Sequence, residues 1–179
     1  MTAFRRLSIA AGLAACLAMP AAARAHATVS EAEDATAALR KADPSLKKFF
    51  EHSAGYAVFP NVAKGGLVVG GAGGTGIVFE NGKAVGKTTL SQVSIGAQVG
   101  GQAYYEIIFF ETAATLAEFK KGEWTMAAQV SAVALASGAS ANADYKGGVA
   151  VFTLSKGGAM AEASVGGQKF SYEPMGGTS

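Results

Sequence analysis

The groups that carry most enzyme chemistry are scarce in this sequence. Its 179 residues include one cysteine, Cys16, and two histidines, His26 and His52. A single cysteine cannot form an internal disulfide, and the His, Cys and acid spacing typical of a zinc site is absent from the sequence. No Ser–His–Asp set has support either. These gaps argue against an enzyme, and we expect neither a cofactor nor a bound metal.

Charged residues are also few, at 16% of the chain, with 15 basic and 13 acidic side chains. Three of the arginines (Arg5, Arg6 and Arg24) lie in the first 25 residues, so 12 basic side chains face 13 acidic ones in the remainder. The basic balance therefore comes from the N-terminal segment, and it predicts no nucleic-acid partner.

The first 25 residues are typical of a secretory signal peptide. Arg5-Arg6 precedes the apolar run Leu7–Met19. Pro20 ends this run ahead of the small-residue segment Ala23-Arg24-Ala25. We expect cleavage before His26 and a periplasmic or secreted protein. The apolar run is too short for a membrane span.

A second interpretation of this segment uses Cys16. Leu13-Ala14-Ala15-Cys16 has the small-residue pattern of a bacterial lipoprotein cleavage site, which would make Cys16 the lipidated N-terminus of a membrane-anchored protein. The apolar run continues past Cys16, which favours simple secretion. In either case residues 26–179 suit a single domain, ordered over about 30–173.

Three helices are expected in that domain. Ser30-Glu31-Ala32-Glu33 matches a capping box and opens a helix that runs to about Ala42. Asp43-Pro44 supplies the N-cap and first position of a second helix, Pro44–Ser53. A third helix is expected over Thr112–Lys121, with Thr112 as its cap.

From Tyr56 onward the pattern predicts strands. Asn81-Gly82, between Ile77–Glu80 and Lys83–Thr88, is the strongest two-residue hairpin signal. Further strands are expected over Ser91–Val99, Ala103–Phe110, Trp124–Ser137, Val149–Ser155, Ala159–Val165 and Lys169–Tyr172. The fold class is therefore α+β, with two N-terminal helices packed on a mostly antiparallel, glycine-rich sheet and one embedded helix.

Glycine is densest in the stretch Gly55–Gly76. Within it, Gly71–Gly76 satisfies the pattern GxGxxG. A dinucleotide site needs a helix to begin at the last glycine, whereas the residues from Ile77 onward predict a strand. We interpret the glycines as allowing strands to approach closely and expect no nucleotide. An enzyme remains a possibility only if Gly70–Gly76 binds one.

One acidic residue, Glu106, lies inside the otherwise apolar run Ala103–Phe110. Together with Glu111 it could form a carboxylate pair. Strand alternation places Glu106 on the same face as Tyr104, which favours a hydrogen-bonded or edge-exposed role instead.

The second helix carries cations beside aromatic residues. Lys47-Lys48-Phe49-Phe50, with Arg40-Lys41 upstream, is typical of an interfacial helix whose apolar side chains enter the headgroup region while its lysines meet anionic lipid. The competing interpretation is an amphipathic helix with Phe49 and Phe50 in the core and solvated lysines.

The order of the motifs resembles the SYLF domain family. The resemblance covers Ala32–Tyr172, and its motifs are Ser45–Phe50, Gly55–Pro60, Lys64–Gly66, Gly70-Gly71, Gly74–Gly76, Ser94–Gly101, Tyr104–Phe110 and Lys156–Gly158. Members of this family are non-enzymatic modules that bind membrane lipids. The resemblance implies lipid binding through Lys41, Lys47, Lys48 and Lys64, with Phe49 and Phe50 as apolar anchors.

What the resemblance implies is an exported module that binds phospholipid, with anionic headgroups, at the periplasmic face of a membrane. Some family members bind actin, which an exported bacterial protein does not meet. The near-neutral charge after residue 25 and the alanine- and serine-rich Gln129–Ala143 depart from eukaryotic members. An alternative is a structural or cell-envelope assembly protein or a small outer-membrane β-barrel, although the leading helices argue against the barrel.

Overall fold

A computed structural model describes residues 26–66, 69–95, 101–157 and 165–176. The predicted signal peptide, Cys16 and most of the predicted strand Ala159–Val165 lie outside these residues. The elements are α1 (Val29–Ala42), the 3₁₀ turn η1 (Pro44–Leu46), α2 (Lys47–His52), β1 (Gly55–Gly66), β2 (Val69–Glu80), β3 (Lys83–Ile95), β4 (Gln102–Phe110), α3 (Ala113–Phe119), β5 (Glu123–Thr125), β6 (Ala132–Ala134), β7 (Val149–Ser155) and β8 (Lys169–Pro174).

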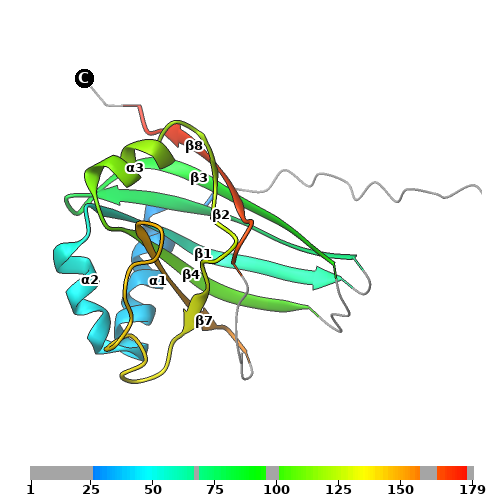
Figure 1. Ribbon diagram of the computed structural model, residues 1–179, viewed down its shortest axis with the longest axis horizontal. Coiled ribbons are helices and arrows are strands. Elements are labelled where there is room, and N and C mark those ends of the chain that lie inside the picture. Colours follow the sequence, from blue (N-terminus) through cyan, green and yellow to red (C-terminus); the bar gives the residue numbers. More distant parts are fainter. Residues whose placement is uncertain (1–25, 67–68, 96–100, 158–164, 177–179) are drawn as a thin grey trace, which may run out of the picture.

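The described strands form one curled sheet in the order β5-β8-β3-β2-β1-β4-β7-β6. All neighbours are antiparallel except β6 and β7, which run parallel. Figure 1 shows α1 and α2 on one face of this sheet, with α3 at the upper end. The structure is therefore α+β and mostly antiparallel.

Helix α1 begins two residues before the position that the sequence predicts. Its N-cap is Thr28, whose hydroxyl accepts a hydrogen bond from the Glu31 amide at 3.2 Å. The Glu31 carboxylate in turn accepts one from the Thr28 amide at 2.8 Å. The prediction that Ser30 and Glu33 form the capping box is therefore wrong, because Thr28 and Glu31 have the same spacing and take that role.

The hairpin predicted at Asn81-Gly82 is confirmed. Asn81 has φ 52° and Gly82 has φ 75°, which is the left-handed geometry that a tight two-residue turn needs. The turn pairs Glu80 with Lys83 and starts the long β2–β3 ladder.

Closure of the sheet follows from the positions of two short strands. β5 and β6 lie at opposite edges, yet only residues 126–131 join them. A segment of this length spans at most roughly 20–25 Å, so the two edges must lie near each other. The prediction of a strand over Trp124–Ser137 is wrong for residues 126–131, because this segment crosses from one edge of the sheet to the other. The strands on either side of it, β5 and β6, have three residues each.

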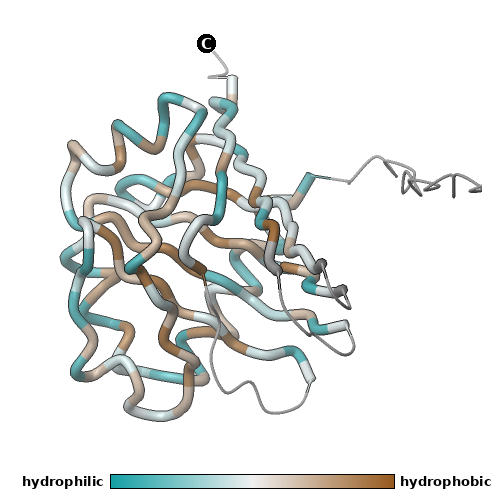
Figure 2. The backbone as a smooth tube through the Cα atoms, turned by 45° about the vertical axis from the view of Figure 1, so that its right-hand side comes forward, coloured by the Kyte–Doolittle hydropathy of each residue, from teal (hydrophilic) through white to brown (hydrophobic). Residues whose placement is uncertain are grey.

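The curled sheet separates two apolar cores. The inner core, which α3 closes with Leu116 and Phe119, includes Ile108 and Phe110 of β4. The outer core lies between the sheet and the α1–α2 pair and includes Ile107 and Phe109 of the same strand. β4 is thus covered on both faces, as its continuous apolar run predicts. Figure 2 shows the apolar residues along the strands at the centre of the molecule.

The glycines of β2 allow it to lie against β1. A Cβ atom on Gly76 would be 2.5 Å from the Val58 carbonyl oxygen, and one on Gly74 would be 2.7 Å from that of Asn61. β1 is irregular at this point, since its pairing register shifts between Val58 and Asn61. The GxGxxG segment is therefore in the interior of a strand, with no helix at its end, and its glycines serve close packing.

Among the described residues, no helix is both long enough and apolar enough to cross a bilayer.

Candidate functional site

The two lysines of α2 have different surroundings. The Lys47 side chain is 71% exposed and pairs with Glu51 one turn later. Their hydrogen bond is the main cause that holds the pKa of Glu51 below its usual value. The Lys48 ammonium instead donates to the carbonyl oxygens of Ala141 at 2.8 Å and Ala143 at 2.9 Å. Lys48 therefore ties α2 to a distant loop, while Lys47 lies at the surface with Glu51 as its ion-pair partner.

Phe49, which the family resemblance implies as an apolar anchor, lies in the outer core. It is 2% exposed, and its ring centroid lies 4.8 Å from that of Phe152 and 5.4 Å from those of Phe109 and Tyr145. In this conformation the ring has no apolar surface to offer a membrane. The structure thus matches the competing interpretation, in which the aromatic side of the helix packs inward.

Phe50 is half-buried at the rim of the same core. Its ring packs edge-on against Tyr56 at 5.1 Å and Phe109 at 4.8 Å. The Arg40 guanidinium covers it, 3.6 Å from the ring centroid. This cation–π contact joins the end of α1 to α2, so Phe50 is covered by protein on several sides.

Lys41 and Lys47 are the cations of this region that remain well exposed without a structural contact of their own to the core. Lys41 lies in the last turn of α1 and Lys47 begins α2, with only residues 43–46 between the helices. Together they place positive charge at one end of the helix pair.

Lys64 lies apart from these two lysines. It is near the far end of β1, paired in register with Ala72 of β2 and Gln102 of β4. Nine residues of strand separate it from Gly55, where β1 starts next to α2, and at about 3.3 Å per residue this is roughly 30 Å. The six residues that the resemblance implies therefore do not form one patch.

Asp43 organises the junction between α1 and α2. Its carboxylate accepts hydrogen bonds from the amides of Ser45 at 2.9 Å, Gly138 at 3.1 Å and Ser140 at 2.7 Å. Burial raises the pKa of Asp43, but these donors outweigh burial and hold the pKa below its usual value. The sequence identifies Asp43 as a cap, but no local signal reveals its bonds to residues 95 and 97 positions later.

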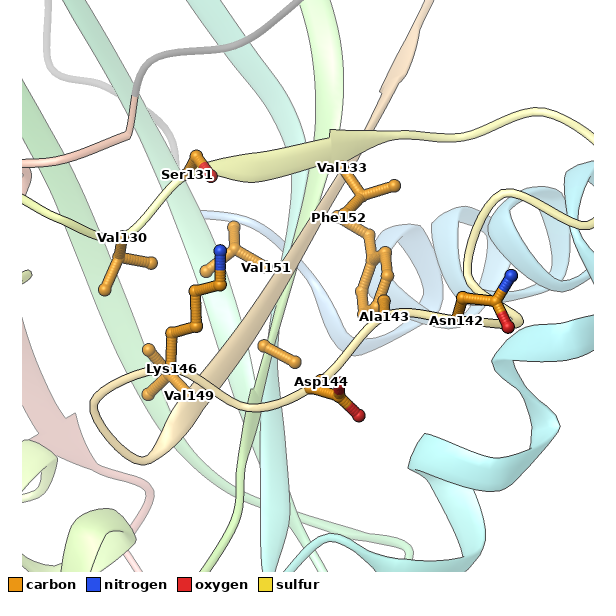
Figure 3. Close-up of a pocket in the computed structure, with 11 residues that line it drawn as sticks. Val130, Ser131, Val133, Asn142, Ala143, Asp144, Lys146, Val149, Val151 and Phe152 are labelled. Atoms are coloured by element: carbon orange, nitrogen blue, oxygen red, sulfur yellow. The ribbon is translucent and has the colours of Figure 1, made fainter.

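Two hollows flank the segment 142–145, in which the Ala143 carbonyl oxygen accepts a hydrogen bond from Lys48. The smaller, of about 210 Å³, lies beside α2 and is lined by Lys48, Phe49, His52, Ala143, Asp144 and Tyr145. The larger, of about 340 Å³, lies between β6, β7 and the same segment (Figure 3). Both include Ala143 and Asp144 in their walls. Sequence patterns missed the larger pocket because three separate segments build it.

Glu106 is fully buried inside the curled sheet. Its Oε2 accepts a hydrogen bond from the Gln168 side-chain amide at 3.1 Å, while its Oε1 has no hydrogen-bond partner among the described residues. Burial raises the pKa of Glu106 to about 8, so the neutral form predominates at neutral pH. The hydrogen-bonded role is confirmed and the edge-exposed one is wrong. Because Glu111 is exposed, the two do not form a catalytic carboxylate pair.

No three His, Cys, Asp or Glu side chains lie close enough to hold a metal ion within the part of the chain that the structure describes.

Comparison with known proteins places the chain in a family. Residues 91–174 match the family described as Ysc84, Las17-binding protein actin regulator. The chain is also similar to the Beta cell expansion factor A of Aeromonas veronii, at 30% identity over 142 residues that cover 78% of this chain and 53% of that protein. It thus spans about half the length of this curated relative. The chain belongs to the Ysc84 family, the SYLF-domain family that its ordered motifs resemble.

Proposed function

We propose that this protein is an exported, non-enzymatic module that binds phospholipid at the periplasmic face of a membrane. The observation that carries the proposal is that the ammonium groups of Lys41 and of Lys47, the latter beside Glu51, are exposed on two consecutive helices in a chain of this family. The family description names actin regulation, but residues 1–25 have the pattern of an export signal, and an exported protein would meet a membrane and not actin.

The expected binding is weak and electrostatic. Each lysine near an anionic surface contributes about 1 kcal/mol, and this contribution falls off within a Debye length. Phe49 is in the core and Phe50 is covered by Arg40, so deep insertion of aromatic side chains adds little. A surface of two exposed lysines therefore binds only where anionic headgroups are dense.

Lys48 and Lys64 are not part of the membrane-binding surface formed by Lys41 and Lys47 in this proposal. Lys48 would not contact the lipid but would fix the position of α2, because its ammonium donates hydrogen bonds to the carbonyl oxygens of Ala141 and Ala143. Lys64 would reach the same membrane as Lys41 only with β1 lying along the bilayer, since roughly 30 Å of strand separates it from the helix pair.

Residues 1–25 would direct export, with cleavage before His26 or, as the alternative, lipidation at Cys16. A lipid-anchored chain would need only weak affinity from its domain, because the acyl chains would already hold it at the membrane. The intact mass of the exported protein distinguishes the two.

Co-sedimentation with vesicles tests the proposed function. Vesicles of phosphatidylcholine with phosphatidylglycerol should carry the protein into the pellet, and vesicles of phosphatidylcholine alone should not. High salt should release the protein, because the attraction is between exposed charges. Equal and negligible binding to both kinds of vesicle would contradict the proposal.

A further inference from the structure

Three polar side chains lie inside the curled sheet and are buried as deeply as the apolar core around them. Glu106 of β4 and Gln168 are 0% exposed, and Thr153 of β7 is 1% exposed. Their atoms Glu106 Oε1, Thr153 Oγ1 and Gln168 Oε1 have no hydrogen-bond partner among the described residues. Buried polar groups in folded proteins are nearly always hydrogen-bonded, because an unpaired one costs free energy. These three oxygen atoms therefore mark a candidate site for a polar partner.

The fold brings the three side chains to one place. Glu106 and Thr153 are direct partners in the register of β4 and β7. Both face the inner core, since Ile108 and Val151, two positions away on the same strands, belong to it. Opposite residues on one face of an antiparallel pair have Cβ atoms about 4.5–5.5 Å apart. Gln168 reaches the same carboxyl, with its Nε2 3.1 Å from Glu106 Oε2. The oxygen atoms without a partner are thus neighbours.

The turn that carries Gln168 is held by backbone hydrogen bonds. The Gln168 amide donates to the Val165 carbonyl oxygen at 3.1 Å. The segment that crosses between the sheet edges adds two more bonds: the Gly167 amide donates to the Met126 carbonyl oxygen at 3.0 Å, and the Met126 amide donates to that of Gln168 at 2.9 Å. The Gln168 side chain therefore extends to Glu106 from a fixed backbone.

The bonding capacities of the three oxygen atoms match those of a water molecule. Burial raises the pKa of Glu106, which keeps its carboxyl protonated at neutral pH. Because Oε2 already accepts from Gln168, the proton belongs on Oε1, which is then a donor. Gln168 Oε1 only accepts, and the Thr153 hydroxyl both donates and accepts. A water molecule has two donors and two acceptor sites, so one molecule can bond to all three.

A metal ion does not match this set. A protonated carboxyl, an amide oxygen and a hydroxyl supply no negative charge to offset a buried cation. The Glu106 Oε1 proton would also point at the ion. The described part of the chain places no basic side chain in an ion pair with Glu106 and gathers no three metal-ligating side chains.

We propose that Glu106, Thr153 and Gln168 form a binding site for one internal water molecule. The water accepts a hydrogen bond from Glu106 Oε1, donates one to Gln168 Oε1 and bonds to the Thr153 hydroxyl. Three bonds are the usual number for a buried water. The water joins β4, β7 and the turn before β8 across the interior of the curled sheet (Figure 1). The site is independent of the membrane surface proposed above, since none of its residues lies on α1 or α2.

Thr153→Val distinguishes a water-bonded hydroxyl from an unpaired one, because the two predict opposite results. With the water bound, the equilibrium constant for folding, measured by urea denaturation at neutral pH, should fall about five- to tenfold. An unpaired hydroxyl would instead give unchanged or higher stability on its removal, and this result overturns the proposal. Thr88→Val is the matched control. The equally buried Thr88 hydroxyl donates to the Ser171 carbonyl oxygen at 2.7 Å, so its loss should cost a similar factor.

A crystal structure that shows ordered water tests the site directly, and it alone decides if Thr153→Val does not fold. One water should lie within hydrogen-bond distance of Glu106 Oε1, Thr153 Oγ1 and Gln168 Oε1. Direct contact among the three side chains, with no water between them, overturns the proposal. A metal ion in this place overturns it as well. Exchange of sodium for potassium at equal ionic strength should therefore leave the melting temperature unchanged, and a shift that Glu106→Gln abolishes would indicate the ion.

Discussion

Gln168 donates a hydrogen bond from its side-chain amide to Glu106 Oε2 at 3.1 Å, with both side chains fully buried inside the curled sheet. Thr153, the cross-strand neighbour of Glu106, has a buried hydroxyl that finds no hydrogen-bond partner in the part of the chain that the structure describes. Burial favours the neutral form of a carboxyl in this setting, since no cation among the described residues pairs with it.

Stability should therefore fall as pH rises through the range in which Glu106 would ionise. Its pKa is about 8 in the folded protein and near the ordinary 4.5 when unfolded, so the folded state holds the proton more tightly between these values. The free energy of unfolding is greatest below the unfolded pKa, and a few kcal/mol are lost between about pH 5 and pH 8.

Glu106→Gln should remove this dependence, because the amide has the same shape and does not ionise. Urea unfolding at several pH values between 5 and 9 measures both proteins. If the free energy of unfolding changed with pH in the same way for both proteins, ionisation of Glu106 would not be the cause of the pH dependence.

Asp43→Ala should destabilise the protein by about 2–4 kcal/mol, because it leaves the amides of Ser45, Gly138 and Ser140 without their acceptor. Asp43→Asn keeps one acceptor oxygen and should cost less. Urea denaturation at neutral pH gives both values. An equal, small loss for the two variants would mean that Asp43 is merely a local helix cap.

Gly76→Ala should destabilise the protein by about 2–3 kcal/mol, through overpacking of the contact between β2 and β1. The matched control is Gly65→Ala, in the adjoining strand, where a Cβ meets no atom within 4 Å. Thermal unfolding compares the two. If Gly76→Ala were as stable as the control, close strand packing would not explain these glycines.

Phe49→Ala should lower the free energy of unfolding by about 3–5 kcal/mol, because it empties a site filled by an aromatic ring among Phe109, Tyr145 and Phe152. Chemical denaturation measures the loss, with Lys47→Ala as a surface control on the same helix. A variant with unchanged stability but weaker vesicle binding would instead give Phe49 the anchoring role.

Local sequence signals predicted the elements whose cause is local. Asn81-Gly82 forms its turn because both residues adopt positive φ, and Asp43 caps the residues that follow it. The first capping box was misplaced because Thr28 and Ser30 each precede a glutamate by three residues, and local pattern alone does not choose between them.

Features that depend on sheet closure could not be predicted in this way. Alternation placed Glu106 beside Tyr104, but its full burial arises only when β8 brings Gln168 over it from 62 residues later. The helical pattern likewise could not tell that Lys48 reaches residues 141 and 143, or that Lys64 lies at the far end of β1. The larger pocket beside segment 142–145 depends on the pairing of β6 with β7, which no sequence pattern indicated.

The most direct test of the membrane proposal reverses the charge of its two exposed lysines. The double variant Lys41→Glu and Lys47→Glu should lose most binding to vesicles that contain phosphatidylglycerol, since about 1 kcal/mol for each lysine is replaced by repulsion. A control with Lys121→Glu and Lys169→Glu has the same net charge on other elements and should bind as the unaltered protein does. Retained binding in the first variant, or equal loss in both, would contradict the assignment of this surface.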